Sequence, residues 1–337
     1  MALYLLGDLH FTNSHEWDEI CFNKFIDYFS NLEVEADSSL LLLGDISDKK
    51  INDSQTITYI SHFFAVALTK FKMIYVVGGN HDMHKDSFKK IRYTTQFVKY
   101  FNPEKIHLIY DEEILDIDDL KVMALPHKET TLGIEEYYNS ELDNKFYSTQ
   151  VDLLVGHLNI YDEKMPIAEG LDIHKFNYKT AYFGHVHSRI GSYAQNYTGS
   201  IMPFKKSEND TTLPRCIAKI TKNKVEEISL PIFKVFKTLD ISKELPDHKK
   251  TDEPTTVYDF VNCNDETVES LRKDYFIRYE KDALEINEEI INEQDANIVE
   301  QMFSNFYEAY TQMCKDLDIH PKRSVNSLVK SLLLEEE

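Results

Sequence analysis

The 337-residue sequence predicts an α/β fold built around a parallel β-sheet, and two observations support this prediction. First, short apolar runs typical of buried strands alternate with longer segments whose apolar residues recur at helical spacing. Second, five of the apolar runs end in short polar motifs that contain Asp, Asn or His. Ligands of such sheets collect at the carboxyl ends of the strands, so these motifs mark the expected functional edge.

The first hundred residues follow the alternating pattern. Apolar runs predict buried strands, and amphipathic segments between them predict helices that cover the sheet. The strands are expected at 3–6, 40–43 and 73–77, and the helices at 16–32, 54–71 and 88–101.

Beyond residue 105 the apolar runs become shorter and acidic turns separate them. We expect strands at 106–109, 114–117, 121–125, 151–155 and 180–183, a helix at 134–146, and antiparallel strands at 190–201, 216–221 and 225–230. Pro231 is a plausible end for this first domain, because proline lacks the backbone N–H that a strand needs.

Two further units are expected, which gives domains at 1–231, 232–285 and 286–337. The second is a small α+β unit with strands at 234–239, 256–261 and 275–279 and a helix at 266–273. The third is a helical pair with an apolar stripe that runs from Ile298 to Leu333 and is interrupted by Pro321. A short tail cannot bury this stripe by itself, so the stripe predicts either a partner groove or packing against its own domain.

The composition restricts the classes of function. The formal net charge is −21, and residues 240–337 alone carry 24 acidic and 11 basic residues. This argues against a broad basic face for nucleic acid, although a nuclease remains possible because bound metal ions supply positive charge. No apolar run reaches the 18 residues of a membrane helix, and Asp8 interrupts the N-terminal run, which we interpret as a strand. Four cysteines without a CxxC pair predict reduced thiols and a cytoplasmic location.

The polar motifs carry metal-ligand chemistry. Asp8 and His10 are one residue apart, and in an extended chain both side chains would point the same way. Asp45 has two carboxylate oxygens and could bridge two ions. Mixed nitrogen and oxygen ligands of this kind suit Mn, Fe or Zn better than Ca or Mg. The predicted ligands are Asp8, His10, Asp45, Asn80, His157, His185 and His187.

Other residues of the motifs are expected to assist. His81 follows the ligand Asn80 and could supply a proton or stabilise the transition state. Asp82 could orient His81 or form a loop hydrogen bond, and Asp48 could support a ligand. Each motif alone is more often structural, as a turn or a surface group, whereas five of them at strand ends predict a two-metal site. We also expect His84 and His127 to line the cleft, and Lys205, Lys206 and Arg189 to form a modest basic rim.

With these residues in view, the sequence resembles the calcineurin-like metallophosphoesterase superfamily. Its pattern D-x-H, G-D, G-N-H-[DE], G-H and G-H-x-H is present in order within residues 3–205. The resemblance implies a four-layer α/β/β/α sandwich and a catalytic His81. It also implies two metal sites, the first formed by Asp8, His10, Asp45 and His187, and the second by Asp45, Asn80, His157 and His185.

Within this superfamily the sequence is most similar to the SbcD family of DNA repair exonuclease subunits, of bacterial or phage type. The similarity rests on Gly44-Asp-Ile-Ser-Asp48, on Tyr197-Thr-Gly-Ser200 and on the order of the three domains. It implies Mn-dependent cleavage of DNA, exonucleolytic on duplex ends and endonucleolytic on single strands. It further implies a homodimer, a capping role for the α+β domain, and an SbcC-type ATPase partner bound by the C-terminal helices.

Two other functions compete with the nuclease. A phosphoesterase for a small molecule or a phosphoprotein would use the same metal ions, but it would need neither the second domain nor the helical tail. A non-enzymatic scaffold on the same fold would be expected to have lost ligands, whereas here all seven are present.

Overall fold

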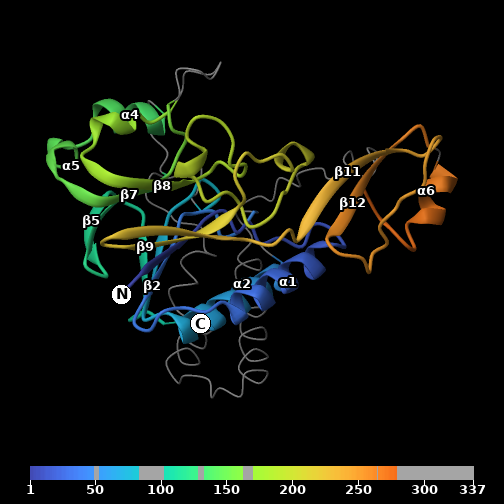
Figure 1. Cartoon of the computed structure of the whole chain (residues 1–337), viewed down its shortest axis with the longest axis horizontal. Coiled ribbons are helices and arrows are strands. Elements are labelled where there is room, and N and C mark those ends of the chain that lie inside the picture. Colours follow the sequence, from blue (N-terminus) through green and yellow to red (C-terminus); the bar gives the residue numbers. More distant parts are fainter. Residues whose placement is uncertain (49–52, 83–101, 128–132, 162–169, 264, 279–337) are drawn as a thin grey trace, which may run out of the picture.

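The computed structural model describes residues 1–48, 53–82, 102–127, 133–161, 170–263 and 265–278. Two large β-sheets lie at its centre and a smaller three-stranded sheet stands to one side (Figure 1). The predicted α/β class is confirmed. The helix expected at 88–101 and the C-terminal segment 286–337 both lie outside the described residues.

The first large sheet has six strands in the order β10-β9-β1-β2-β3-β4. The pairs β1–β2, β2–β3 and β3–β4 are parallel, whereas β9 runs antiparallel to both β1 and β10. The parallel strands thus bring three of the polar motifs to one edge. The strands are β1 (Leu3–Leu6), β2 (Ser39–Leu42), β3 (Met73–Val77), β4 (Ile106–Ile109), β9 (Cys216–Thr221) and β10 (Lys224–Ser229).

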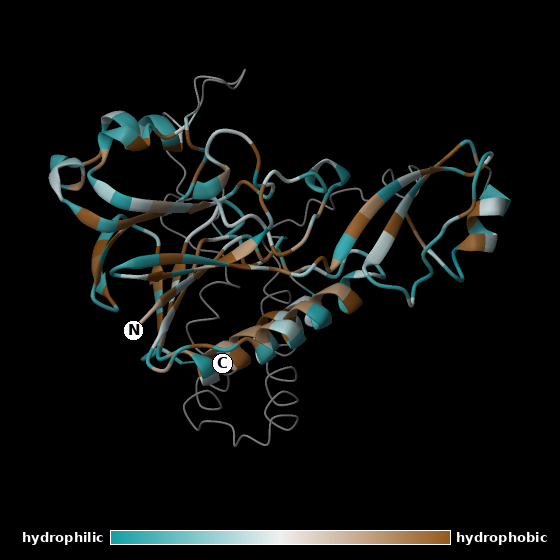
Figure 2. Ribbon diagram, viewed as in Figure 1, coloured by the Kyte–Doolittle hydropathy of each residue, from teal (hydrophilic) through white to brown (hydrophobic). Residues whose placement is uncertain are grey.

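Two helices cover the outer face of this sheet, α1 (Asp18–Asn31) and α2 (Ser54–Lys70). Their facing sides are aromatic: the ring centroids of Phe29 and Phe63 are 4.8 Å apart, and both residues belong to one buried core with the strands. The Asp53 carboxylate caps α2 by accepting a hydrogen bond from the backbone N–H of Thr56. Such buried aromatic packing holds the helices on the sheet, as the brown inner faces in Figure 2 show.

The second large sheet has the order β5-β6-β7-β8 and faces the first. A single core contains residues of both sheets, among them Leu5 and Leu41 from the first sheet and Val122 and Leu153 from the second. This core fixes the two sheets against each other, so that both present their polar motifs to a shared edge. The strands are β5 (Glu113–Ile117), β6 (Leu120–Leu125), β7 (Val151–His157) and β8 (Tyr178–Gly184).

The helix expected at 134–146 is two short helices, α4 (Ile134–Ser140) and α5 (Asn144–Ser148), which pack over the outer face of this second sheet. The chain breaks because Asp143 adopts a non-helical conformation and its carboxylate caps α5 by accepting from the backbone N–H of Lys145. Asp at an N-cap favours such a new start.

The strand predicted at 190–201 is wrong. This segment is irregular, with a short 3-10 helix η2 (Ala194–Asn196) and a single bridge from Tyr197 to β8. Gly191 and Gly199 have positive φ angles of 79° and 71°, which interrupt an extended chain. Ala194, Tyr197 and Ile201 are nevertheless buried, whereas Ile190 is exposed. The Tyr197 hydroxyl accepts a hydrogen bond from the backbone N–H of Ile160.

Residues 234–278 form a separate unit, which we call the three-stranded module. Its strands β11 (Lys234–Asp240), β12 (Thr255–Val261) and β13 (Phe276–Arg278) are parallel, and helix α6 (Asp265–Leu271) packs on them. It is the orange part of Figure 1. Ion pairs Lys24–Glu253 and Lys250–Glu16 join it to the region around α1. Two more 3-10 helices, η1 (Ile173–Lys175) and η3 (Lys206–Glu208), lie in loops.

Among the described residues, Cys21, Cys216 and Cys263 are unpaired thiols. No helix within the same residues combines the length and the apolar character that a membrane span requires.

Candidate metal centre

The five polar motifs meet at the edge where strands of both large sheets end. Asp8 and His10 follow β1, Asp45 follows β2, and Asn80 follows β3. The second sheet contributes His157 at the end of β7 and two histidines after β8. All seven predicted ligands lie in this one cluster, connected by the contacts described below.

The backbone at this edge has an unusual conformation. Asp8, His10 and Asp45 have φ angles of 52°, 45° and 52°, and His185 has a φ of 85°. The expectation that Asp8 and His10 share an extended strand is therefore wrong. Hydrogen bonds from the N–H of Asp8 to Gly44 O and of His10 to Asp45 O hold this conformation. A left-handed conformation at a residue other than glycine costs about 1–3 kcal/mol and is concentrated at functional sites.

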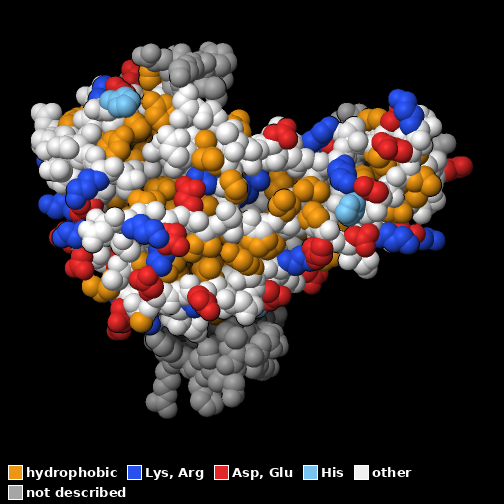
Figure 3. Space-filling model, viewed as in Figure 1, with side chains coloured by type: hydrophobic (Ala, Val, Ile, Leu, Met, Phe, Trp, Pro, Cys, Tyr) orange, Lys and Arg blue, Asp and Glu red, His pale blue; other side chains and the backbone are white. Residues whose placement is uncertain are grey.

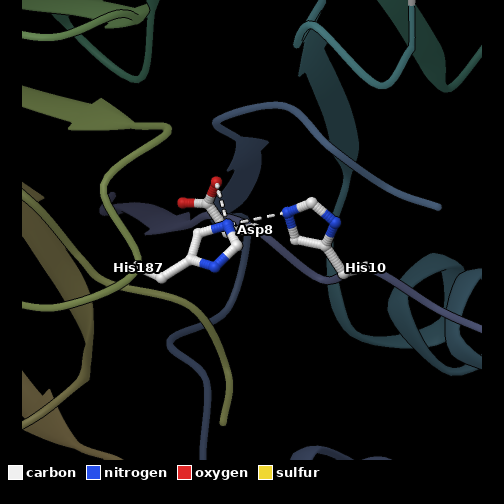
Figure 4. Close-up of side chains that lie close together, drawn as sticks. All are labelled: Asp8, His10 and His187. Carbon is white, nitrogen blue, oxygen red and sulfur yellow. Dashed lines mark hydrogen bonds and ion pairs between the residues drawn. The ribbon is translucent and has the colours of Figure 1, made fainter. Parts of the chain in front are cut away.

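One group of side chains consists of Asp8, His10 and His187 (Figure 4). The Nε2 atoms of His10 and His187 are 2.9 Å apart, and His187 Nε2 is 3.8 Å from Asp8 Oδ1. On its other side His187 donates through Nδ1 to the carboxylate of Glu208 at 3.0 Å. His187 Nε2 therefore carries the lone pair of the neutral ring and points it toward His10 and Asp8.

A second group surrounds His157, which is completely buried. Its Nδ1 donates to the carbonyl oxygen of Leu43 at 2.7 Å, so Nε2 is the lone-pair nitrogen of the neutral ring. This nitrogen lies 2.9 Å from Asn80 Oδ1 and 3.2 Å from Asp45 Oδ2. His185 Nδ1 lies 3.0 Å from the same Asn80 oxygen.

Asp45 lies between the two groups. Its Oδ2 is 3.3 Å from His10 Nε2 and 3.2 Å from His157 Nε2. Asp45 is only 1% exposed, so water does not satisfy this carboxylate. Its position is the one that a ligand shared between two ions would need.

The donor set fits divalent cations. Imidazole nitrogens and carboxylate or amide oxygens face one another at 2.9–3.3 Å around Asp45 and His157. Among the described residues, the buried Asp8 Oδ2 has no hydrogen-bond partner. Buried acceptors that face one another are costly unless a positive charge lies between them. Such mixed imidazole and carboxylate ligands suit a transition metal, but they do not identify which one.

The titration of the histidines reflects this arrangement. Burial disfavours the charged ring of His10, but hydrogen bonds to Asp45 and Asp48 and the nearby carboxylate charges outweigh it and raise its pKa to about 10. Burial likewise opposes the charge of His157, and Asp45 raises its pKa to about 9. Burial and the charge of His157 lower the pKa of His185 to about 3.

His81 borders the cluster and is accessible, with 34% of its side chain exposed. Its Nδ1 donates to the carbonyl oxygen of Asp48 at 2.6 Å, and its backbone N–H donates to Asp45 Oδ1 at 2.8 Å. The ring therefore has a fixed orientation, with Nε2 left for proton exchange. The Asp48 carboxylate also lies 3.4 Å from His10 Nδ1, so Asp48 supports both rings.

The Asp82 carboxylate forms hydrogen bonds to the loops, the second of the two roles expected for it. The buried carboxylate accepts hydrogen bonds from the backbone N–H groups of Asp45, Ile46 and Gly79 at 2.6, 3.1 and 2.9 Å. Burial and the Asp45 charge raise the pKa of Asp82, whereas these N–H donors favour its ionised form. Asp82 thus joins the loops after β2 and β3.

The surroundings of the cluster correct one expectation. Arg189 is fully buried and pairs with Glu227 at 2.6 Å, so it is a structural residue and cannot belong to a basic rim. Lys205 and Lys206 are exposed.

His127 approaches the cluster, since its ring centroid is 6.5 Å from that of His157, and burial lowers its pKa to about 4. His84 is outside the described residues. Glu208 was missed, because no motif or spacing relates this turn residue to a strand.

The comparison with protein families agrees with this geometry. The family model described as calcineurin-like phosphoesterase matches residues 1–189, which include all seven predicted ligands. The chain belongs to this family. Metal-dependent hydrolysis of phosphoesters is therefore the general chemistry of the site.

No curated protein matches the chain. Among solved structures, phosphopantetheinyl hydrolase (PptH) from Mycobacterium tuberculosis is similar with 15% identity and a TM-score of 0.24 over 37% of this chain and 41% of that one. The chain thus spans less than half of that protein. A protein of unknown function from Aquifex aeolicus, AQ665, is similar with 15% identity and a TM-score of 0.28 over 52% of this chain and 87% of that one.

Proposed function

We propose that the chain is a metal-dependent DNA nuclease subunit of SbcD type, which hydrolyses phosphodiester bonds in DNA repair or recombination. The observation that carries this proposal is the attachment of the three-stranded module beside the metal centre. Phe204 packs against His10 and His187, with ring centroids 5.2 and 5.8 Å apart, and the buried Lys234 at the start of β11 lies over the same Phe204 ring at 5.0 Å. A polymer substrate can use a second surface at this position, whereas a small phosphoester does not need one.

The residues of the chain have separable roles in this chemistry. When bound, two divalent ions activate water and neutralise phosphate charge. Mn²⁺ is our proposal for both. His81 would exchange a proton through Nε2 with the leaving oxygen, because Asp48 O holds Nδ1. Asp82 would hold the backbone of Asp45 at a fixed position relative to the loop that carries His81.

The partners follow from the same proposal. Residues 286–337 would bind an SbcC-type ATPase, residues 232–285 would act as a capping domain, and helices of the domain at 1–231 would form a homodimer. The protein would act in the cytoplasm, or in the host cytoplasm if it is encoded by a phage.

The charge favours a second candidate, a phosphoesterase for a small molecule or a phosphoprotein. A net charge of −21 repels a DNA backbone, and acidic side chains are interspersed with basic ones on the face in Figure 3. A scaffold without activity is disfavoured, because it would not need the ligand cluster and an oriented His81.

The deciding experiment incubates the purified full-length chain with Mn²⁺ and end-labelled duplex DNA, with and without an SbcC-type ATPase. Parallel reactions contain a small unactivated phosphodiester and a phosphopeptide. Shortening of the duplex from its ends supports the proposal. Turnover of a small substrate, with DNA intact even when the ATPase is present, would replace the nuclease by the second candidate.

The variant His81→Ala tests the assignment of the proton donor. We expect about a 10²–10⁴-fold loss of turnover, the usual contribution of a positioned acid or base. Mn²⁺ affinity should stay unchanged in calorimetric titration, since His81 is not one of the seven ligands. His174→Ala, which removes an exposed histidine on η1, is the matched control. Full activity of His81→Ala would remove His81 from the mechanism.

A further inference from the structure

We propose that Glu208 is a positioning residue, which holds the His187 ring in the orientation and tautomer that metal binding requires. The inference rests on the proposed metal-dependent function, but it concerns a residue outside the motifs. Glu208 follows the last histidine motif by about twenty residues and lies in η3, a turn that the chain places against the metal centre.

The contact between Glu208 and His187 determines which ring nitrogen is available. Glu208 Oε1 lies 3.0 Å from His187 Nδ1. A carboxylate only accepts hydrogen bonds, so Nδ1 carries the hydrogen and Nε2 keeps its lone pair. This Nε2 is the atom that lies 2.9 Å from His10 Nε2 and faces Asp8. A carboxylate behind a ligating imidazole also raises its basicity.

The carboxylate itself is held rigidly. Its second oxygen, Oε2, accepts from the backbone N–H of Phe204 at 2.7 Å and of Lys205 at 3.3 Å. The residue is 9% exposed, and the guanidinium of Arg215 donates to its carbonyl oxygen. Both oxygens therefore have fixed partners, and rotation of the side chain would break three hydrogen bonds at once.

The turn is also fixed at its far end. The Asn209 side chain accepts from the backbone N–H of Phe236 at 3.0 Å and donates to the carbonyl oxygen of the same residue on β11. The Asn209 side chain thus bonds to β11, whereas its neighbour Glu208 contacts the predicted ligand His187 directly. Substitutions at these adjacent positions can therefore separate a loss of turn structure from a loss of ring orientation.

The test is a calorimetric Mn²⁺ titration of full-length wild type, Glu208→Gln, Glu208→Ala and Asn209→Ala, without any substrate. Gln keeps the size of the side chain but replaces one acceptor oxygen by an NH₂ group. Its single carbonyl oxygen can accept from the Phe204 N–H or from His187 Nδ1, whereas the Glu208 carboxylate accepts from both. We expect one of two ions to bind about 10–100-fold more weakly in both Glu208 variants, the usual effect of losing such a support. Asn209→Ala should bind like the wild type.

Combination with His187→Ala makes the test specific. If Glu208 acts through the ring, Glu208→Gln should weaken binding no further once His187 is absent. Wild-type affinity in a folded Glu208→Gln variant, equal losses with and without His187, or an equal loss in Asn209→Ala would each overturn the proposal. If Glu208→Ala does not fold, the isosteric Gln variant decides alone. Because the titration contains no DNA, failure of the nuclease assay leaves this result intact.

Discussion

The carboxylate of Asp82 offers a quantitative test of how the centre is assembled. It is fully buried and accepts three backbone N–H bonds, two from the loop after β2 and one from Gly79. Asp82→Ala removes both acceptor oxygens and leaves three buried donors unsatisfied. Each such donor costs about 1–3 kcal/mol. Water entering the space would recover part of this cost, so we expect a total loss of about 3–5 kcal/mol.

The milder variant Asp82→Asn keeps one carbonyl oxygen. If this oxygen takes the place of Oδ2, the bonds from Asp45 and Gly79 remain and the NH₂ group faces the N–H of Ile46. The expected loss is about 1–3 kcal/mol, the cost of one unsatisfied donor. The order of stability should therefore be wild type, Asn variant, Ala variant.

Thermal unfolding followed by circular dichroism measures both variants in metal-free buffer. With about 2–4 °C per kcal/mol for a domain of 150–250 residues, Asp82→Ala should lower Tm by at least about 6 °C. It should also weaken Mn²⁺ binding, because Asp45 loses its support. Asp53→Ala removes the cap of α2 and is the control, with about 1 kcal/mol lost and normal metal binding. A Tm for Asp82→Ala within the error of the wild type would refute this reasoning.

Two further predictions concern protons and glycine. The pKa values of His10 and His157, raised to about 10 and 9, mean that protons compete with metal ions, so calorimetric Mn²⁺ affinity should rise from pH 6 to 8 by up to about tenfold per pH unit for each displaced proton. The same raised values stabilise the metal-free fold most fully below pH 6.5, and this contribution should disappear as the pH rises through 9 and 10. A pH-independent Mn²⁺ affinity would contradict the first statement, and a metal-free Tm that is no lower above pH 9 than below pH 6.5 would contradict the second. Gly44 and Gly133 have φ angles of 95° and 90°, but only at Gly44 would a Cβ approach His157 and the Cα of Gly79, the latter at 2.9 Å. Gly44→Ala should therefore abolish metal binding in the same titration, while Gly133→Ala should lose about 1–2 kcal/mol of stability from backbone strain and bind normally.

The sequence predicted the strands and site residues that depend on a local pattern. Apolar runs placed β1, β2 and β3, and the motif at the end of each strand predicted residues that the structure brings together. Prediction from the sequence failed where the interacting residues are far apart in the sequence. Glu208 meets His187 only because the loop after β8 folds back, and Arg189 is buried only because Glu227 on β10 faces it. Neither partner is indicated by spacing along the sequence.

The wrong strand at 190–201 has a related cause. Its alternating apolar residues resemble a half-buried strand. Tyr197, however, forms only a single bridge to β8, and its hydroxyl accepts a hydrogen bond from the backbone N–H of Ile160. Positive φ angles at Gly191 and Gly199 do not appear in an apolar pattern. The assignment of each ligand to a particular ion and the division into domains remain predictions.

Four residues of the centre have a left-handed backbone: Asp8, His10, Asp45 and His185. This conformation affects which substitutions would accumulate if catalysis were no longer under selection. Glycine adopts such a conformation without strain, so replacement of any of these four residues by glycine would relieve local strain while it removed a metal-facing side chain. Loss of chemistry and relief of backbone strain would then coincide. A copy of the gene freed from the need for catalysis would make this change with less damage at His10 and His185 than at Asp8 and Asp45, whose carboxylates accept the backbone N–H groups of His185 and His81. An active copy must keep the strained residue at all four positions.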